Sequence, residues 1–304
     1  MNKVLILGGT GFVGRSLCAL IAGSDSATEI TVPSRRPVQA RQWGLPPSAR
    51  IVGADVHDAA QLAGLVDGQD AVVNLIAILH GSDADFVRTH VALPRTLVGA
   101  CRSKGVRRIV HVSALGVDSA QPSCYLRSKA EGEAVLQGAD LDVTLLRPSV
   151  IYGRHDRFMN LFARLSRFAP VLPLASADAR FQPVWVEDVA RAILVCLERP
   201  GTAGQIFECT GPEIFTLREL VKLAGRWSGH ERSVIALPPA LGMLQAAVME
   251  RMPGETLMSG DNLQSMKTPN VASGTLPSLE DLGIRAAALD TVAPKYLGAG
   301  HAQS

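Results

Sequence analysis

Short apolar runs alternate with segments of helical periodicity through the first half of the chain. The first run, at residues 4–7, leads into a glycine-rich turn, and further strands are expected at 29–33, 49–53, 71–76, 108–113 and 143–147. Helical patterns lie between them, for example at 59–66, 84–103 and 125–137. Continuous apolar strands that alternate with helices are typical of a parallel sheet covered on both faces. The pattern therefore predicts an α/β fold with a doubly wound parallel sheet.

The regular alternation fades after Pro148. Residues 156–167 and 184–197 have helical patterns, and 205–209 has the pattern of another strand. From about Glu213 the chain is richer in Pro, Gly and Met. We expect a Rossmann domain over residues 1–150 with a return segment at about 181–212. A smaller C-terminal lobe is expected from residues 151–180 and 213–304.

Three glycines spaced three apart separate the first strand from a helical segment that begins at Phe12. A strand, a glycine turn and a helix together direct backbone N–H groups and a helix N-terminus toward a pyrophosphate. A Cβ atom would block the turn, the approach of the phosphate or the packing of helix on strand. The turn therefore predicts a dinucleotide site. Its expected members are Gly8, Thr10, Gly11, Phe12, Val13 and Gly14.

Ser34, Arg35 and Arg36 follow the second strand. An acidic residue at this place commonly binds the ribose 2′-hydroxyl and selects NAD. Two arginines can instead clamp a 2′-phosphate, although a solvated basic loop is the alternative interpretation. We therefore predict NADP(H) in preference to NAD(H). Further cofactor contacts are expected from Asp55, Val56, Ile76, Ala77, Lys129, Pro148 and Ile151.

Ser113 ends the fifth expected strand, and Tyr125 and Lys129 stand four residues apart on the helix that follows. A helix places those two side chains on one face. A neighbouring ammonium favours the phenolate, and lowering a tyrosine pKa by about three units requires roughly 4 kcal/mol. We expect Ser113 to hydrogen-bond a substrate oxygen and Tyr125 to transfer the proton. For the tyrosine and lysine alone, a plain amphipathic helix surface is the alternative.

These motifs together resemble the short-chain dehydrogenase/reductase superfamily, in its atypical or extended branch, over about the first 210 residues. The resemblance implies that Ser113, Tyr125 and Lys129 are the catalytic set and that Lys129 also holds the nicotinamide ribose. Extended members commonly have an asparagine near His90, where this chain has Thr89-His90-Val91. Asn74 is a candidate to supply that amide.

Residues 123–133, 148–158 and 263–271 carry a second and closer resemblance. They are similar to the bacterial relatives of the NADPH-binding alpha-subcomplex accessory subunit of respiratory complex I. This resemblance implies tight binding of a pyridine nucleotide. Two functions stay open: an NADP(H)-dependent oxidoreductase or isomerase acting on a hydrophobic, quinone- or isoprenoid-like substrate, and a non-catalytic accessory or assembly protein of complex I.

Composition narrows the class of partner. A net charge of +2 over 304 residues does not favour nucleic acid. The five cysteines form no C-x-x-C pair, so we expect a reducing compartment and no disulfides. No metal site is expected, because His90 and His111 lack spaced partner ligands. With Met1 just before the first strand and no apolar run of about 18 residues, we expect no targeting peptide and no membrane span. The expected location is the cytoplasm, with peripheral contact at the inner membrane left open.

Two apolar helical patterns are relevant to a peripheral membrane contact. Apolar side chains recur at helical spacing in residues 158–168, with arginines nearby. A helix facing the core is the preferred interpretation, and a face toward anionic lipid, a respiratory complex or a lipid-like substrate is the alternative. Residues 238–252 are rich in Leu and Met, and Met-rich surfaces adapt to varied partners. A core helix of the smaller lobe is the preferred interpretation of this segment, and such a partner surface is the alternative.

Overall fold

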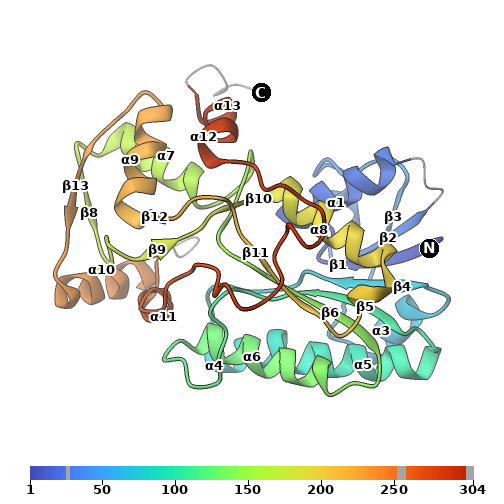
Figure 1. The fold of residues 1–304 in the computed structure, drawn as a ribbon. Coiled ribbons are helices and arrows are strands. Elements are labelled where there is room, and N and C mark those ends of the chain that lie inside the picture. Colours follow the sequence, from blue (N-terminus) through green and yellow to red (C-terminus); the bar gives the residue numbers. More distant parts are fainter. Residues whose placement is uncertain (25–27, 252–257, 299–304) are drawn as a thin grey trace.

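The structure is a computed structural model, and it describes residues 1–24, 28–251 and 258–298. A seven-stranded parallel sheet in the order β11-β6-β5-β4-β1-β2-β3 forms its centre (Figure 1). The strands are β1 (Lys3–Leu7), β2 (Glu29–Ser34), β3 (Ala49–Gly53), β4 (Ala71–Asn74), β5 (Arg108–Val112), β6 (Asp142–Pro148) and β11 (Ile206–Cys209). The predicted doubly wound sheet is confirmed.

Helices cover both faces of this sheet (Figure 1). One face carries α1 (Phe12–Gly23) and α8 (Val186–Glu198), and the other carries α3 (Ala59–Val66), α5 (Leu93–Lys104) and α6 (Cys124–Gln137). The side chains of β1 alternate between the two faces: Val4 and Ile6 pack on the α1 side, Leu5 and Leu7 on the other. Burial on both faces is why the strands are continuously apolar.

The helix expected over residues 84–103 forms, but it is interrupted. α4 (Asp83–Val87) leads into a π-helical turn (Arg88–Ala92), and α5 continues from Leu93. A capping box between Ser82 and Asp85 begins α4. π-helical turns are frequent at functional sites. This one lies directly against α6, the helix that carries Tyr125 and Lys129.

A smaller lobe is built from the second half of the chain around a core of its own. Three two-stranded pairs, β10–β7, β12–β9 and β13–β8, belong to it. Its strands are β7 (Ile151–Tyr152), β8 (Val171–Leu174), β9 (Arg180–Phe181), β10 (Val184–Trp185), β12 (Phe215–Thr216) and β13 (Ser233–Ala236). Its helices are α7 (Met159–Phe168), α9 (Leu217–Trp227), α10 (Pro239–Arg251), α11 (Gly260–Ser265), α12 (Leu289–Val292) and α13 (Pro294–Leu297).

The C-terminal segment also returns to the large sheet. Leu279, Leu282 and Ile284 are buried in the same core as α1 and α8. Ser278 forms a β-bridge with Glu208 of β11, which extends this contact to the edge of the sheet. Residues after 213 therefore contribute to both cores.

The two ambiguous apolar helices differ in the structure. In α7, Phe162 belongs to the core of the smaller lobe, whereas Phe168 at the helix end is 83% exposed. In α10 the buried residues are small, Gly242 and Ala246. The large apolar side chains of α10 that face solvent are Leu241, Met243, Leu244 and Val248. The expectation that this helix is a core helix is therefore wrong, and Met252 lies outside the described residues.

None of the helices in the described ranges is both long enough and apolar enough to cross a membrane.

Candidate active site

The predicted site residues gather at one edge of the large sheet. The chain winds outward from β1 to β2 and β3 on one side, and through β4, β5 and β6 on the other. Ligands of open α/β sheets bind where the winding changes direction, beyond the carboxyl ends of the strands. The glycine turn and Ser34, Asp55, Ile76 and Ser113 each lie at or just after the carboxyl end of one of these strands.

The glycine turn connects β1 to α1 with little room for side chains. Gly8 has a φ of +81°, which strongly favours glycine. A Cβ on Gly14 would lie 2.4 Å from the Gly8 carbonyl oxygen, so only glycine lets α1 pack this closely on the turn. A Cβ on Gly11 would meet only that same oxygen, at 3.1 Å. The turn therefore leaves backbone exposed at the start of α1.

The start of α1 fits the pyrophosphate of a dinucleotide. Gly11 is its N-cap, without a side-chain cap among the described residues, and its first turn holds no acidic residue. The first N–H groups of a helix lack internal partners and carry the positive end of the helix dipole. Phe12 lies against the chain at Gly153, where a Cβ would be 3.2 Å from the phenyl ring. Thr10 and Val13, the other expected members, are half-buried in the same turn.

Arg35 and Arg36 are exposed just after β2, and neither forms an ion pair with a described carboxylate. Ser34 accepts a hydrogen bond from the Arg36 N–H through its hydroxyl, which fixes the start of this loop. Two guanidinium groups without carboxylate partners are available to an external anion. This arrangement is consistent with binding of a 2′-phosphate, and it is equally consistent with a solvated basic loop.

The loops after β3 and β4 supply the remaining predicted contacts. Asp55 accepts the His57 N–H, and its own N–H donates to Gln61. Val56 is buried in the core beneath it. Ile76 approaches the glycine turn, since a Cβ on Gly8 would lie 3.3 Å from its Cγ1. Ala77 follows it, while Pro148 ends β6 and Ile151 begins β7.

Ser113, Lys129 and Val112 meet at the end of β5. The Lys129 ammonium is buried and donates a 3.0 Å hydrogen bond to the Val112 carbonyl oxygen. The next residue, Ser113, is 4% exposed, and its Oγ has no hydrogen-bond partner among the described residues. Buried hydroxyls are normally satisfied, so this oxygen is a candidate contact for a ligand.

Burial sets the protonation states of the other two members of the set. It raises the pKa of Tyr125 to about 12 and lowers the pKa of Lys129 to about 8, the latter opposed by the Glu133 carboxylate. The sequence predicts that the ammonium favours the phenolate, but in the protein alone desolvation outweighs it. Tyr125 therefore holds its proton at neutral pH, which is the form needed to donate one.

His90 occupies the π-helical turn and supports Tyr125 from the side. Its Nε2 accepts the Ile78 N–H at 3.1 Å, so the neutral ring carries its proton on Nδ1 and donates it to Ser128 Oγ at 2.8 Å. Ser128 in turn donates to the Tyr125 carbonyl oxygen. The His90 ring lies edge-on to the Tyr125 ring at 5.5 Å. Burial and the nearby Lys129 ammonium lower the pKa of His90 to about 3, so it stays neutral.

Asn74 is fully buried, and its side chain is used within the protein. Its amide nitrogen donates to His111 Nδ1 at 3.1 Å, and its oxygen accepts the Ile76 N–H. His111 is buried as well, and burial lowers its pKa well below the usual value. This pair fixes the loop after β4, and His90 rather than Asn74 lies beside Tyr125.

Known proteins share this sequence pattern and this fold. The model of the NAD dependent epimerase/dehydratase family matches residues 4–209, which is more than half of the chain. The chain belongs to this family. The match covers the glycine turn, Ser113, Tyr125 and Lys129.

Two curated relatives and one solved structure show the range of the similarity. Subunit 9 of the NADH dehydrogenase [ubiquinone] 1 alpha subcomplex of Mus musculus is 31% identical over 294 residues, covering 94% of this chain and 77% of the subunit. Ceramide reductase of Caulobacter vibrioides is 28% identical over 248 residues, covering 81% and 76%. The NADPH-dependent quinone oxidoreductase QOR2 of Escherichia coli has the same fold, with a TM-score of 0.75, 20% identity and coverage of 97% and 99%.

Family membership makes this chain an NAD(P)-binding protein of the oxidoreductase type. Among the described residues, no group of three or more His, Cys, Asp and Glu side chains is placed to hold a metal ion. All five cysteines are free.

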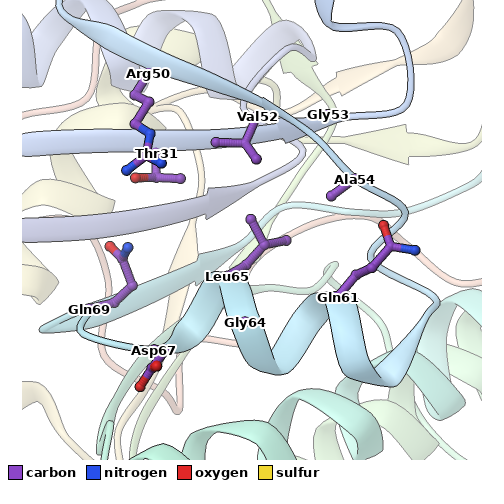
Figure 2. Close-up of a pocket in the computed structure, with 10 residues that line it drawn as sticks. All are labelled: Thr31, Arg50, Val52, Gly53, Ala54, Gln61, Gly64, Leu65, Asp67 and Gln69. Carbon is purple, nitrogen blue, oxygen red and sulfur yellow. The ribbon is translucent and has the colours of Figure 1, made fainter.

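A recess of about 310 Å³ lies between β2, β3 and α3 (Figure 2). Thr31 and Arg50 border it from the strands, and Gln61, Leu65 and Gln69 from α3 and the loop after it. None of the predicted catalytic residues lines it.

Three features of the site have no local signal in the sequence. The π-helical turn that places His90 is one. Gly132 is the second: a Cβ there would fall 2.0 Å from the His90 carbonyl oxygen, so glycine allows α6 to touch this turn. The third is Asp261, which is far away in the sequence and reaches the first turn of α6.

Proposed function

We propose that the protein is an NADP(H)-dependent oxidoreductase acting on a carbonyl group of a hydrophobic, quinone- or isoprenoid-like molecule. The observation that carries this proposal is Ser113. Its hydroxyl is buried at the carboxyl end of β5 with no partner in the part of the chain that the structure describes, one residue from the carbonyl that holds Lys129. A substrate oxygen would satisfy that hydroxyl, and Tyr125 lies in the first turn of the helix that also carries Lys129.

The chain's own residues supply orientation and one proton. A nicotinamide, when bound, supplies the hydride that reduces the carbonyl carbon. Ser113 donates a hydrogen bond to the carbonyl oxygen. Tyr125 gives that oxygen its phenolic proton, so that the product is an alcohol. The phenolate then regains a proton from solvent. The Lys129 ammonium stabilises the phenolate and holds the ribose of the cofactor.

Isomerisation is the related reaction of the same groups. In that case the phenolate form of Tyr125, stabilised by the Lys129 ammonium, would accept the proton of the substrate alcohol, and the oxidised cofactor would take its hydride. The resulting carbonyl would then be reduced again from its other face. The net result is inversion at one carbon with no net consumption of NADP(H). The family includes epimerases, so both reactions belong to the proposal.

The names of two similar proteins support the proposed substrate class. The arginine pair supports the proposed preference for NADP(H). Ceramide reductase and quinone oxidoreductase are named for an apolar lipid and a quinone. Arg35 and Arg36 stand where an acidic residue would select NAD.

Turnover of Tyr125→Phe tests the proposal. NADPH oxidation is followed with a short-chain ubiquinone analogue and with an isoprenoid aldehyde, and the products are checked for epimerised alcohol. Loss of a positioned proton donor costs about 10²–10⁴-fold in rate, so Tyr125→Phe should lose nearly all turnover. Tyr296→Phe removes the same oxygen from a phenol that bonds Asp156 in the smaller lobe, and it should retain turnover. Equal rates in wild type and Tyr125→Phe would refute the mechanism.

A second function is favoured by the 31% identity to the complex I subunit along 94% of this chain. In this alternative, bound NADPH stabilises a non-catalytic accessory or assembly protein, located in the cytoplasm and held peripherally at the inner membrane. Affinity purification from native membranes should then recover complex I subunits, equally well with wild type and with Tyr125→Phe. Absence of those subunits from the purified material would exclude this function.

A further inference from the structure

The smaller lobe holds the first turn of the catalytic helix through a single carboxylate. Asp261, in α11, accepts the Cys124 N–H at 2.6 Å with Oδ1. Its Oδ2 accepts the Ser123 hydroxyl at 2.8 Å and the Tyr125 N–H at 3.1 Å. These three donors surround the N-terminus of α6, and one of them is the backbone of Tyr125 itself.

These donors have no alternative acceptor within the helix. The first N–H groups of an α-helix precede any carbonyl that could reach them. Ser123 is the N-cap of α6, and its Oγ already accepts the Leu126 N–H. Asp261 therefore completes the cap from outside, and it places negative charge at the positive end of the helix dipole.

Asp261 is itself held firmly in place. Ser259 and Asn262 form a capping box around it at the start of α11. Further along, Thr268 donates to the Gln121 side chain at 2.7 Å, and a Cβ on Gly116 would lie 3.2 Å from the Thr268 methyl group. Residues 259–268 thus contact the loop between Ser113 and Tyr125 at several points.

We propose that Asp261 is a positioning residue for Tyr125. By fixing the first turn of α6 it holds the phenol in register with Ser113 and couples the smaller lobe to the reacting groups. Its effect on turnover rests on the proposed oxidoreductase function, whereas its hold on α6 does not.

Amide hydrogen exchange and steady-state kinetics of Asp261→Asn, Asp261→Glu and Asp281→Asn test this role. Asp281 is the matched control, because it also accepts a backbone N–H and a serine hydroxyl, both from Ser278 and away from α6. Exchange at Cys124 and Tyr125 should accelerate at least tenfold in Asp261→Asn and stay unchanged in Asp281→Asn. The kcat of Asp261→Asn should fall at least tenfold, with KM and the Kd for NADPH within twofold of wild type. Asp261→Glu, which retains the carboxylate, should recover part of kcat.

The possible outcomes separate this inference from the proposed function. Unchanged exchange at Cys124 and Tyr125 overturns the inference, whether or not the enzyme turns over. Accelerated exchange with an unchanged kcat also overturns it, while the oxidoreductase function stands. If wild type turns over neither probe substrate and exchange still accelerates, the oxidoreductase function fails and the hold on α6 is supported. A variant that fails to fold is replaced by Asp261→Glu, for which the same exchange readout decides.

Discussion

At the scale of single residues, this protein buries a lysine, Lys129, and burial destabilises the charged form of its side chain. Lys129 is 2% exposed and is held by the Val112 carbonyl oxygen, with the Glu133 carboxylate nearby. Glu133 is itself bound by the Arg147 guanidinium through two hydrogen bonds. A site that keeps such a group sacrifices stability for function, as active sites commonly do.

Lys129→Met should stabilise the cofactor-free protein at neutral pH. Burial lowers the pKa of Lys129 from 10.5 to about 8, so the unfolded chain binds this proton more tightly than the native protein. The penalty, roughly 3 kcal/mol at most, is complete below about pH 8 and disappears as the pH rises to about 10.5. Denaturant unfolding at several pH values should show the advantage of Lys129→Met shrinking over that range. Lys104→Met, at a half-exposed lysine paired with Asp67, should differ little from wild type at any pH.

The arginine pair should decide between the two nicotinamide cofactors. Hydrogen bonds to charged groups contribute about 1.5–3 kcal/mol each. Arg35→Ala with Arg36→Ala should therefore weaken NADPH binding by at least tenfold, about 1.4 kcal/mol, and leave NADH binding within about twofold. Fluorescence titration of both cofactors measures this, with the exposed Arg50→Ala on β3 as control. Equal weakening of NADPH and NADH, or of neither, would assign the pair to a solvated loop.

At the scale of elements, the site depends on how closely α6 approaches the π-helical turn. The chain at His90 runs over Gly132, with no room for a Cβ between them. The same turn provides the imidazole that donates to Ser128, whose hydroxyl in turn donates to the Tyr125 carbonyl. Local backbone geometry and the position of Tyr125, the proposed proton donor, are therefore linked through one glycine.

Gly132→Ala should destabilise the protein and reduce turnover together. Its Cβ would lie 2.0 Å from the His90 carbonyl oxygen, which forces α6 away from the turn. Overpacking of this kind typically costs about 1–3 kcal/mol. Gly99→Ala on α5 is the matched control, because its Cβ meets nothing within 4 Å among the described atoms. That control should be neutral or stabilising by up to about 1 kcal/mol, because alanine favours helix. Thermal unfolding and turnover measure both variants, and a stable, active Gly132→Ala would contradict this description of the contact.

At the scale of the whole molecule, the two lobes are interlocked by the chain that passes between them. The last part of the chain first packs Leu279 and Leu282 against α8 and then continues to α12 and α13 in the smaller lobe. Asp188 at the start of α8 accepts the Ala287 N–H, which joins the same two regions. We therefore expect the lobes to unfold in one transition.

Leu282→Ala tests this interlocking, because Leu282 lies outside the sequence range of the large domain and yet packs in its core. Leu282 is 2% exposed in the core beside α1 and α8, and removal of a buried leucine side chain costs about 2–5 kcal/mol. Leu244→Ala, at a side chain that is 61% exposed on α10, should change the free energy of unfolding by less than about 0.5 kcal/mol. Circular dichroism and the fluorescence of Trp227, measured in a background in which Trp43 and Trp185 are replaced by Phe, should report the same midpoint. Two separate transitions would show that the lobes unfold independently.

The sequence by itself determined the large sheet and the family of the chain. Apolar strands buried on both faces and helices of regular periodicity are local patterns, so β1 to β6 and the helices between them could be predicted. The glycine turn could be predicted as well, because the φ of Gly8 and the close contact at Gly14 both require glycine. Ser113, Tyr125 and Lys129 could be predicted as a set for the same reason, since strand ends and helix spacing fix their positions, and their catalytic role stays a prediction.

Only the tertiary structure decided how these parts are completed. Desolvation, rather than the neighbouring ammonium, sets the pKa of Tyr125, and burial cannot be read from the four-residue spacing. α10 turns its large apolar side chains outward because small residues, Gly242 and Ala246, are the ones that fit against the lobe. Asp261 accepts the Tyr125 N–H of α6 from 136 positions further along the chain, and no local periodicity indicates this contact. Contacts between distant segments depend on the packing of the whole chain, which is why the sequence located the site and the fold alone showed what supports it.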